Sequence, residues 1–129
     1  MGKLAKGAIV GFACLVLVAL GAAAVAEVVP LYPPLECDLA PEIQHVFLPD
    51  IGWAFFDGNW AGGPDGVYES VKMSYGDGHS ESWVNVTYTS DSFDNQYDLS
   101  GKDRGYRWYP KLTVKNGGTV SDTVIVEIW

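Results

Sequence analysis

Apolar and polar residues alternate with a period of two along much of the chain after residue 42, where no helical period is present. In Tyr106–Lys115 the even positions carry Tyr, Trp, Pro, Leu and Val, whereas the odd positions are mostly charged or polar. Asn116-Gly117-Gly118 follows and suits a tight turn, and Thr119–Trp129 then alternates again. This pattern predicts a C-terminal β-hairpin with one buried face.

Other runs with the same period predict further strands at Ile43–Leu48, Ile51–Phe56, Val67–Tyr75 and Val84–Thr89. In Val84–Thr89, Val84 and Val86 are expected to face inward, and Trp83 just before them is expected to face outward. Trp53 and Phe55 are expected in the core. Six or seven short strands with short connections favour an all-β fold, an antiparallel β-sandwich, because parallel pairs need long crossovers.

Two stretches interrupt this alternation. Asp57–Gly66 is rich in Gly and Asp, and Thr89–Gly105 is a polar and charged stretch of 17 residues. Both are interpreted as loops, and long loops often carry function.

The N-terminal segment 1–26 has the pattern of an export signal. Lys3 and Lys6 precede 19 uncharged residues, Ala8–Ala26, which end in Ala24-Val25-Ala26. A positive start, an apolar middle and a small-x-small end are typical of a secretory signal peptide, and cleavage is predicted after Ala26.

Two alternatives stay open for this segment. Nineteen apolar residues are just long enough to cross a bilayer, so the segment is also interpreted as an uncleaved membrane anchor. Lys6-Gly7 before an apolar run resembles the processing site of type IV pilin-like proteins, in which the apolar helix is kept and packs into a filament. All three interpretations export the rest of the chain, which predicts a secreted or cell-surface protein.

Residues 27–41 are interpreted as a proline-rich stalk. Four prolines in 15 residues oppose a helix and favour an extended chain. The alternative is that Glu27–Leu35 adds as a strand to a neighbouring subunit, since proline is tolerated at sheet edges. The domain itself is then expected over 42–129.

Charge and cysteine content narrow the class of protein. The net charge is −8, and without residues 1–26 six lysines and arginines oppose 16 acids. This balance argues against nucleic-acid binding, which needs a basic face. Cys37 is the one cysteine outside the export segment, so no internal disulfide is expected there. It is expected to be a free thiol, or else to link two chains.

Three motifs stand out along this part of the chain, namely Val71–Gly78, Val84–Thr89 and Lys111–Asn116 with the glycines that follow. All three resemble segments of the polycystic-kidney-disease (PKD) domain. Val71–Gly78, VKMSYGDG, is similar to the W-D-F-G-D-G stretch of that family and keeps the aromatic-Gly-Asp-Gly part. Val84–Thr89 resembles its V-x-H-x-Y segment. Lys111–Asn116 with the following glycines is similar to its closing L-x-V-x-N-x-x-G hairpin.

The chain also departs from the family pattern. Met73 stands at the usual Trp position and Val86 where His is common, while Trp108 and Pro110 replace Tyr and Val before the closing motif. The resemblance spans roughly residues 41–129. It implies an immunoglobulin-like sandwich that serves as a spacer, an adhesion unit or a binder of proteins or carbohydrates. Most relatives are modules of larger proteins, in which a spacer role is natural. This chain is expected to have a single domain, so a spacer role makes less sense and self-assembly is a further hypothesis.

The Gly76-Asp77-Gly78 turn is interpreted first as a structural corner, since glycine permits unusual backbone angles and Asp bonds turn N–H groups. A calcium site is the alternative, because carboxylates are the ligands that Ca²⁺ prefers. Its candidate ligands, whose spacing fits no defined calcium loop, are Asp65, Asp77, Asp91 and Asp94. No other cofactor is predicted.

The remaining candidates are aromatic rings and one modification site. Trp60 and Trp83 are candidate rings for stacking on a sugar or a partner surface. Asn85-Val86-Thr87 is an N-glycosylation sequon. His45 and His79 are isolated in sequence; His45 is expected to be structural, and His79 is expected to be exposed in the turn after Gly78. No nucleophile, metalloprotease or phosphate-loop motif is present, so no enzyme is predicted.

Together these observations predict an exported, non-catalytic module for adhesion or protein contact. Its partner is expected to be a protein or glycan at the cell surface, and the membrane is contacted through residues 1–26 if they are not removed. The alternatives are a self-assembling filament, pilus or surface-layer subunit, with copies of the chain as partners, and a carbohydrate-binding module.

Overall fold

The computed structural model describes residues 31–49 and 52–129 of the chain. The predicted export segment, its cleavage after Ala26 and Ile51 lie outside these residues. The chain divides into two units, Met1–Pro34 and Leu35–Trp129, and all described strands lie in the second. No described residue is helical, so this part offers no helix that could span a membrane. The described part is all-β, as the sequence predicts.

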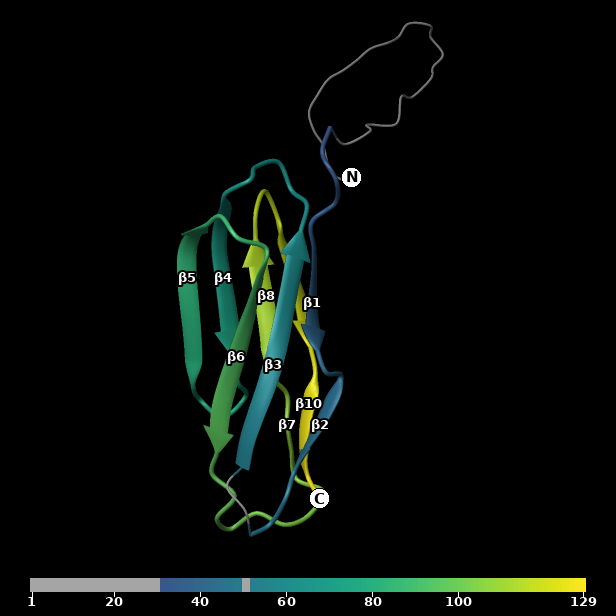
Figure 1. Cartoon of the computed structure of the whole chain (residues 1–129), viewed down its shortest axis with the longest axis vertical. Coiled ribbons are helices and arrows are strands. Elements are labelled where there is room, and N and C mark those ends of the chain that lie inside the picture. Colours follow the sequence, from purple (N-terminus) through teal and green to yellow (C-terminus); the bar gives the residue numbers. More distant parts are fainter. Residues whose placement is uncertain (1–30, 50–51) are drawn as a thin grey trace, which may run out of the picture. The chain divides into compact units, whose positions relative to one another are not determined.

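The ten strands of this part form three sheets. They are β1 (Glu36–Ala40), β2 (Ile43–Val46), β3 (Gly52–Ala61), β4 (Tyr68–Ser74), β5 (Ser80–Val86), β6 (Ser90–Tyr97), β7 (Arg107–Trp108), β8 (Lys111–Lys115), β9 (Thr119–Thr123) and β10 (Ile125–Ile128). The sheet orders are β1-β3-β6, β5-β4-β8-β9 and β2-β10-β7. In Figure 1, β3 and β6 lie in front of β4 and β8, so sheets β1-β3-β6 and β5-β4-β8-β9 form separate layers.

The strand pairs are antiparallel with one exception, which the sequence pattern does not predict. β2 pairs with β10 in parallel, and Ile43 lies opposite Ile125. A parallel pair needs a long connection between its strands. Here the connection is nearly the whole domain, because β2 and β10 come from its two ends.

The predicted C-terminal hairpin is present but changes sheet midway. β8 and β9 pair around Asn116-Gly117-Gly118. Beyond Pro110 and Val124 the two arms of the hairpin continue as the pair β7–β10 in the third sheet. Val124 N–H donates to Pro110 O at 2.9 Å, which keeps the two arms together at the break between the sheets. Because proline has no N–H to donate, the ladder is interrupted at this point.

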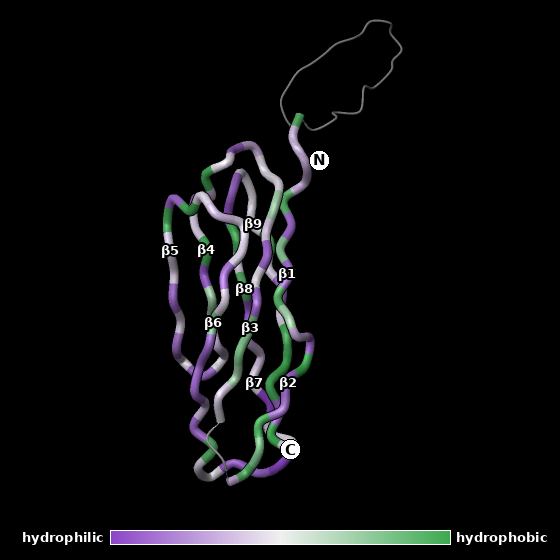
Figure 2. Tube along the Cα trace, viewed as in Figure 1, coloured by the Kyte–Doolittle hydropathy of each residue, from purple (hydrophilic) through white to green (hydrophobic). Residues whose placement is uncertain are grey.

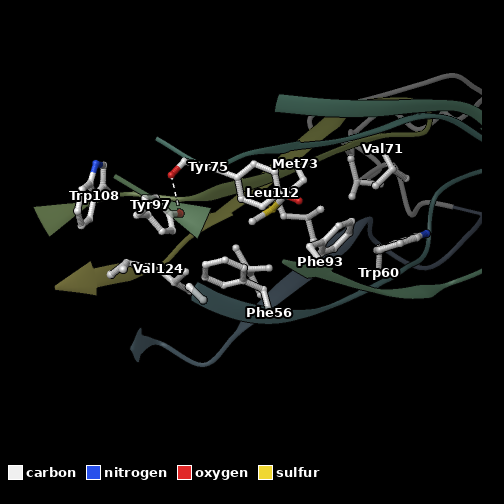
Figure 3. Packing of buried hydrophobic residues seen from close by; sticks show 14 of the residues in the cluster. Phe56, Trp60, Val71, Met73, Tyr75, Phe93, Tyr97, Trp108, Leu112 and Val124 are labelled. Atoms are coloured by element: carbon white, nitrogen blue, oxygen red, sulfur yellow. Dashed lines mark hydrogen bonds between the residues drawn. The ribbon is translucent and has the colours of Figure 1, made fainter. Parts of the chain in front are cut away.

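The core takes buried side chains from all three sheets and is rich in aromatic rings (Figure 3). The rings of Phe56 and Tyr75 have centroids 6.2 Å apart, and those of Tyr97 and Trp108 are 4.6 Å apart. Leu112, Val114, Val126 and Ile128 are fully buried, as the alternation predicts. The described part therefore has a sandwich-like packing of one sheet on another.

Three segments predicted as loop or stalk belong to strands instead. β3 continues through Asp57–Ala61, β6 occupies half of the predicted loop Thr89–Gly105, and β1 lies within the predicted stalk. Figure 2 shows β6 in largely hydrophilic colours. It is an edge strand whose buried positions, Phe93, Asn95 and Tyr97, are separated by exposed polar residues. Its composition therefore resembles a loop although its pattern is that of a strand.

The alternation also changes phase in β5. Val84 is predicted to face inward but is 70 % exposed, whereas Trp83 is half-buried against the core. Val86 is buried as predicted. Between them Asn85 has a φ of +53°, which interrupts the regular pleat. The predicted faces are therefore wrong before this residue and right after it.

Candidate functional site

The Gly-Asp-Gly corner connects β4 to β5 and is fastened to β6. Gly76 and Gly78 have φ of +81° and +98°, which favour glycine. The Asp77 carboxylate accepts hydrogen bonds from His79 N–H at 3.0 Å and from Asn95 Nδ2 at 2.9 Å. Burial by itself would raise the pKa of Asp77, but these hydrogen bonds hold it below its ordinary value. The carboxylate is thus occupied by neighbouring groups of the protein.

Two tyrosines extend this network into the core. Tyr97 Oη donates to Tyr75 O at 2.8 Å, and Tyr75 Oη donates to Glu81 Oε2 at 2.8 Å (Figure 3 shows the first bond). Burial raises the pKa of both hydroxyls, and for Tyr75 the bond to Glu81 adds to this effect. Tyr97 lies in the stretch predicted as a loop, so the sequence does not predict this connection.

The four candidate calcium ligands do not form a cluster. Asp65 is in the β3–β4 connection, Asp77 is at the corner, Asp91 lies opposite Gly58, and Asp94 lies opposite Phe55. Across residues 31–49 and 52–129, no three His, Cys, Asp or Glu side chains come close enough together to hold a metal ion. The arrangement therefore gives no geometric support to the calcium hypothesis.

The two tryptophans proposed as ligand-facing rings are engaged within the domain. Trp60 is only 3 % exposed, and its Nε1 donates to Tyr88 O at 2.8 Å. The ring centroid of Trp83 on β5 lies 5.7 Å from that of Phe93 on β6, so the two rings pack between the two sheets. The expectation that these rings face a ligand is wrong for Trp60, and Trp83 turns toward the core.

Trp53 and Phe55 form an exposed aromatic pair instead, although the sequence pattern predicts them in the core. They are 44 % and 62 % exposed, with near-parallel rings (18°) whose centroids are 6.3 Å apart. The even positions of β3 carry Phe56 and Trp60 into the core, which leaves the odd positions outside. The missed signal is that the odd positions continue with Asp57 and Asn59, so this side of the strand is the polar one.

Gln44 holds β3 in place beneath this pair. β1 ends where Ala40 pairs with Asp57, and among the described residues no strand forms a ladder with the next part of this β3 edge. The Gln44 amide takes that place: its Nε2 donates to Phe55 O at 2.8 Å, and Phe55 N–H donates to its Oε1 at 2.9 Å. A side chain thus completes the ladder beside Phe55.

The outer side of sheet β1-β3-β6, named here the acidic face, combines this pair with carboxylates. Residues paired across the strands share a face, so the register assigns its members. They are Glu36, Asp38, Ala40, Trp53, Phe55, Asp57, Asn59, Ala61, Ser90, Ser92, Asp94 and Gln96. These described positions include four carboxylates and no lysine or arginine.

The outer side of sheet β5-β4-β8-β9, named here the lysine face, is of the opposite kind. The register assigns to it Ser70, Lys72, Ser74, Ser80, Ser82, Val84, Lys111, Thr113, Lys115, Thr119, Ser121 and Thr123. These described positions carry three lysines and no carboxylate. Glu69, near the start of β4, lies outside the paired register and accepts a hydrogen bond from Gly117 N–H at 3.2 Å.

The remaining candidate residues are the sequon asparagine, the two histidines and the cysteine. Asn85 is exposed on the edge strand β5, as a glycosylated residue must be. His79 is exposed in the corner, and His45 Nε2 lies 3.2 Å from Glu127 Oε1. Cys37 Sγ donates to Leu112 O at 3.8 Å, and burial, with Asp122 and Asp38 nearby, raises the pKa of the thiol to about 11. A reactive thiolate is disfavoured at this position.

No protein-family model matches the chain, and comparison with curated proteins and with solved structures found no match either.

Proposed function

We propose that this chain is an exported, non-catalytic contact module at the cell surface or outside the cell, with an immunoglobulin-like sandwich of PKD type. Its task is to bind a protein or glycan surface through the outer side of one sheet. The proposal combines the export pattern of residues 1–26 with the all-β domain that follows.

The PKD-like part of the proposal is supported by two corners. Tyr75 at the end of β4 is buried and the glycines after it adopt the positive φ that the motif requires. Asn116, at the end of the closing motif, is buried, and its Nδ2 donates to Gly62 O and Asp65 O at 3.1 and 2.8 Å. Both motif residues thus hold turns in place, which gives a physical reason for their positions in the sequence.

The Trp53–Phe55 pair is the observation that carries the contact function. Large aromatic rings exposed side by side on a sheet are costly to leave in water and are typical of contact surfaces. Here the strand beneath them is braced by β6 on one side and by Gln44 on the other. The rings are therefore presented on a rigid support, which lowers the entropy lost on binding.

The test of export is the N-terminus and accessibility of the mature protein. Mass spectrometry of the protein from its native cells should find a start at Glu27 for a secreted domain, at Ala8 for a pilin-like subunit or at Met1 for an anchored one. Lysines of the domain should react with a membrane-impermeant amine reagent on intact cells or in the medium. A full-length chain protected from the reagent until lysis would refute the proposal.

A self-assembling subunit is the second candidate function, and the opposite charges of the two outer faces favour it. Electron microscopy of extracellular material should then show ordered fibres or arrays that contain the chain. Monodisperse particles at high concentration would count against assembly.

A further inference from the structure

We infer that the acidic face of one copy of this chain docks on the lysine face of the next, so that the partner of the exposed Trp53–Phe55 pair is a second copy. This deepens the proposed function, on which it rests, by naming the partner and both surfaces.

The first argument is the separation of charge. Residues 27–129 contain six lysines and arginines, and half of them, Lys72, Lys111 and Lys115, lie on the lysine face. The acidic face holds four of the carboxylates and none of the cations among the described residues. The two sets lie on opposite layers of one domain. Complementary charge of this kind sets the orientation of docking and disfavours contact between like faces.

The second argument is the chemistry between the charges. Trp53 and Phe55 offer ring faces, which attract ammonium groups, and the lysine side chains offer both the ammonium group and an apolar stem. Around them the acidic face carries the hydrogen-bonding side chains Asn59, Ser92 and Gln96, and the lysine face carries a row of threonines and serines. Each kind of group on one face therefore has a counterpart on the other.

The third argument concerns geometry. An acidic face meeting a lysine face is a heterologous contact, and it leaves a free lysine face on one copy and a free acidic face on the other. When the rotation between copies does not close, such contacts continue into a linear stack. A flat patch of three strands about 4.8 Å apart, each of five residues, covers roughly 250 Å², well below the roughly 800 Å² per partner of a stable complex. One contact is therefore weak, and a stack gains strength when copies are concentrated at one surface.

Charge-reversal complementation with the full chain tests this inference. One variant carries Lys72→Glu and Lys111→Glu and so has two acidic faces, and the other carries Asp57→Lys and Asp94→Lys and so has two basic faces. Each is purified in a nonionic detergent at 0.15 M salt, where screening beyond about 8 Å suppresses the repulsion between whole molecules. Self-association is followed by sedimentation, and unchanged circular dichroism confirms that both variants fold.

The wild-type chain should self-associate, each variant alone should associate at least about tenfold more weakly, and the mixture of the two should regain association. The matched control carries Lys102→Glu and Arg104→Glu. These substitutions change the net charge by as much as Lys72→Glu with Lys111→Glu but lie outside both faces, so the control should behave like wild type. The apolar segment 1–30 is the same in all samples, so its own association with detergent cancels.

Three outcomes would overturn the inference: a wild-type chain that stays monomeric, association that neither variant weakens, or a mixture that does not recover. Retention of monomeric wild type on a neutral glycan matrix, lost in Trp53→Ala, would assign the aromatic pair to a carbohydrate instead. None of these outcomes changes the result of surface labelling, so failure of this inference is distinguishable from failure of the proposed export.

Discussion

The acidic face and the lysine face are built on the same plan and differ in what they present to the outside. In β3 and in β8 every second residue is buried in one shared core, while the residues between them lie on the outer side of the sheet and are not constrained by core packing. In β3 these outward positions carry Trp, Phe, Asp, Asn and Ala, and in β8 they carry Lys, Thr and Lys. The difference teaches that a sandwich can hold two unrelated surfaces back to back, because one core satisfies both sheets.

The largest expected effect comes from breaking the core that both faces share. Leu112→Ala should lower the free energy of unfolding by about 2–5 kcal/mol, because Leu112 is fully buried and its removal leaves a cavity. Denaturant unfolding measures this loss. Thr113→Ala, one residue along on the lysine face, is the matched control and should cost less than about 1 kcal/mol. Similar losses for both would mean that the two sides of β8 are not distinct.

Asn116→Ala should have the next largest effect, a loss of about 1–3 kcal/mol. The substitution removes a buried amide and leaves the part-buried carbonyls of Gly62 and Asp65 without their donor. Thermal or denaturant unfolding measures it, with Asn59→Ala on the acidic face as the exposed control, expected within about 0.5 kcal/mol of wild type. Equal values would show that the Asn116 amide does not hold the β3–β4 connection.

Asp77→Asn should cost about 1 kcal/mol at pH 7 and much less at pH 3. The pKa of Asp77 is lowered in the folded protein, so its contribution is present above a pH of about 4 and is lost as the pH falls through the folded pKa. The difference in unfolding free energy between wild type and variant, measured at both pH values, checks the sign. A difference that grows toward acid would show that the hydrogen bonds from Asn95 and His79 do not favour the carboxylate.

The smallest effect on stability is expected on the outer faces themselves. Phe55→Ser and Lys72→Ser should each change the free energy of unfolding by less than about 0.5 kcal/mol, because both side chains are exposed. Both should nevertheless weaken self-association, one from each side of the same contact. If Phe55→Ser destabilises the fold by more than about 2 kcal/mol, the aromatic pair is structural and the comparison of the two faces fails.

Some elements of this fold could be predicted from the sequence and others could not, for reasons that particular residues show. The β8–β9 hairpin has a clear apolar phase and a Gly-rich turn, so its pairing follows from local pattern. In β3 both phases carry aromatics at first, and the choice between Phe55 and Phe56 depends on the strand continuing through Asp57. In β6 the buried residues are few and the rest are polar, because the strand lies at an edge.

By itself the sequence determined the β class, the closing hairpin and the glycine-rich corner, since each depends on residues close together in the chain. Only the tertiary structure decided which tryptophans are buried, that β2 joins β10 in parallel, and that the charges separate onto opposite layers. These features depend on which strands become neighbours. That choice is made by packing between residues far apart in sequence, such as Cys37 with Leu112 and Asp77 with Asn95.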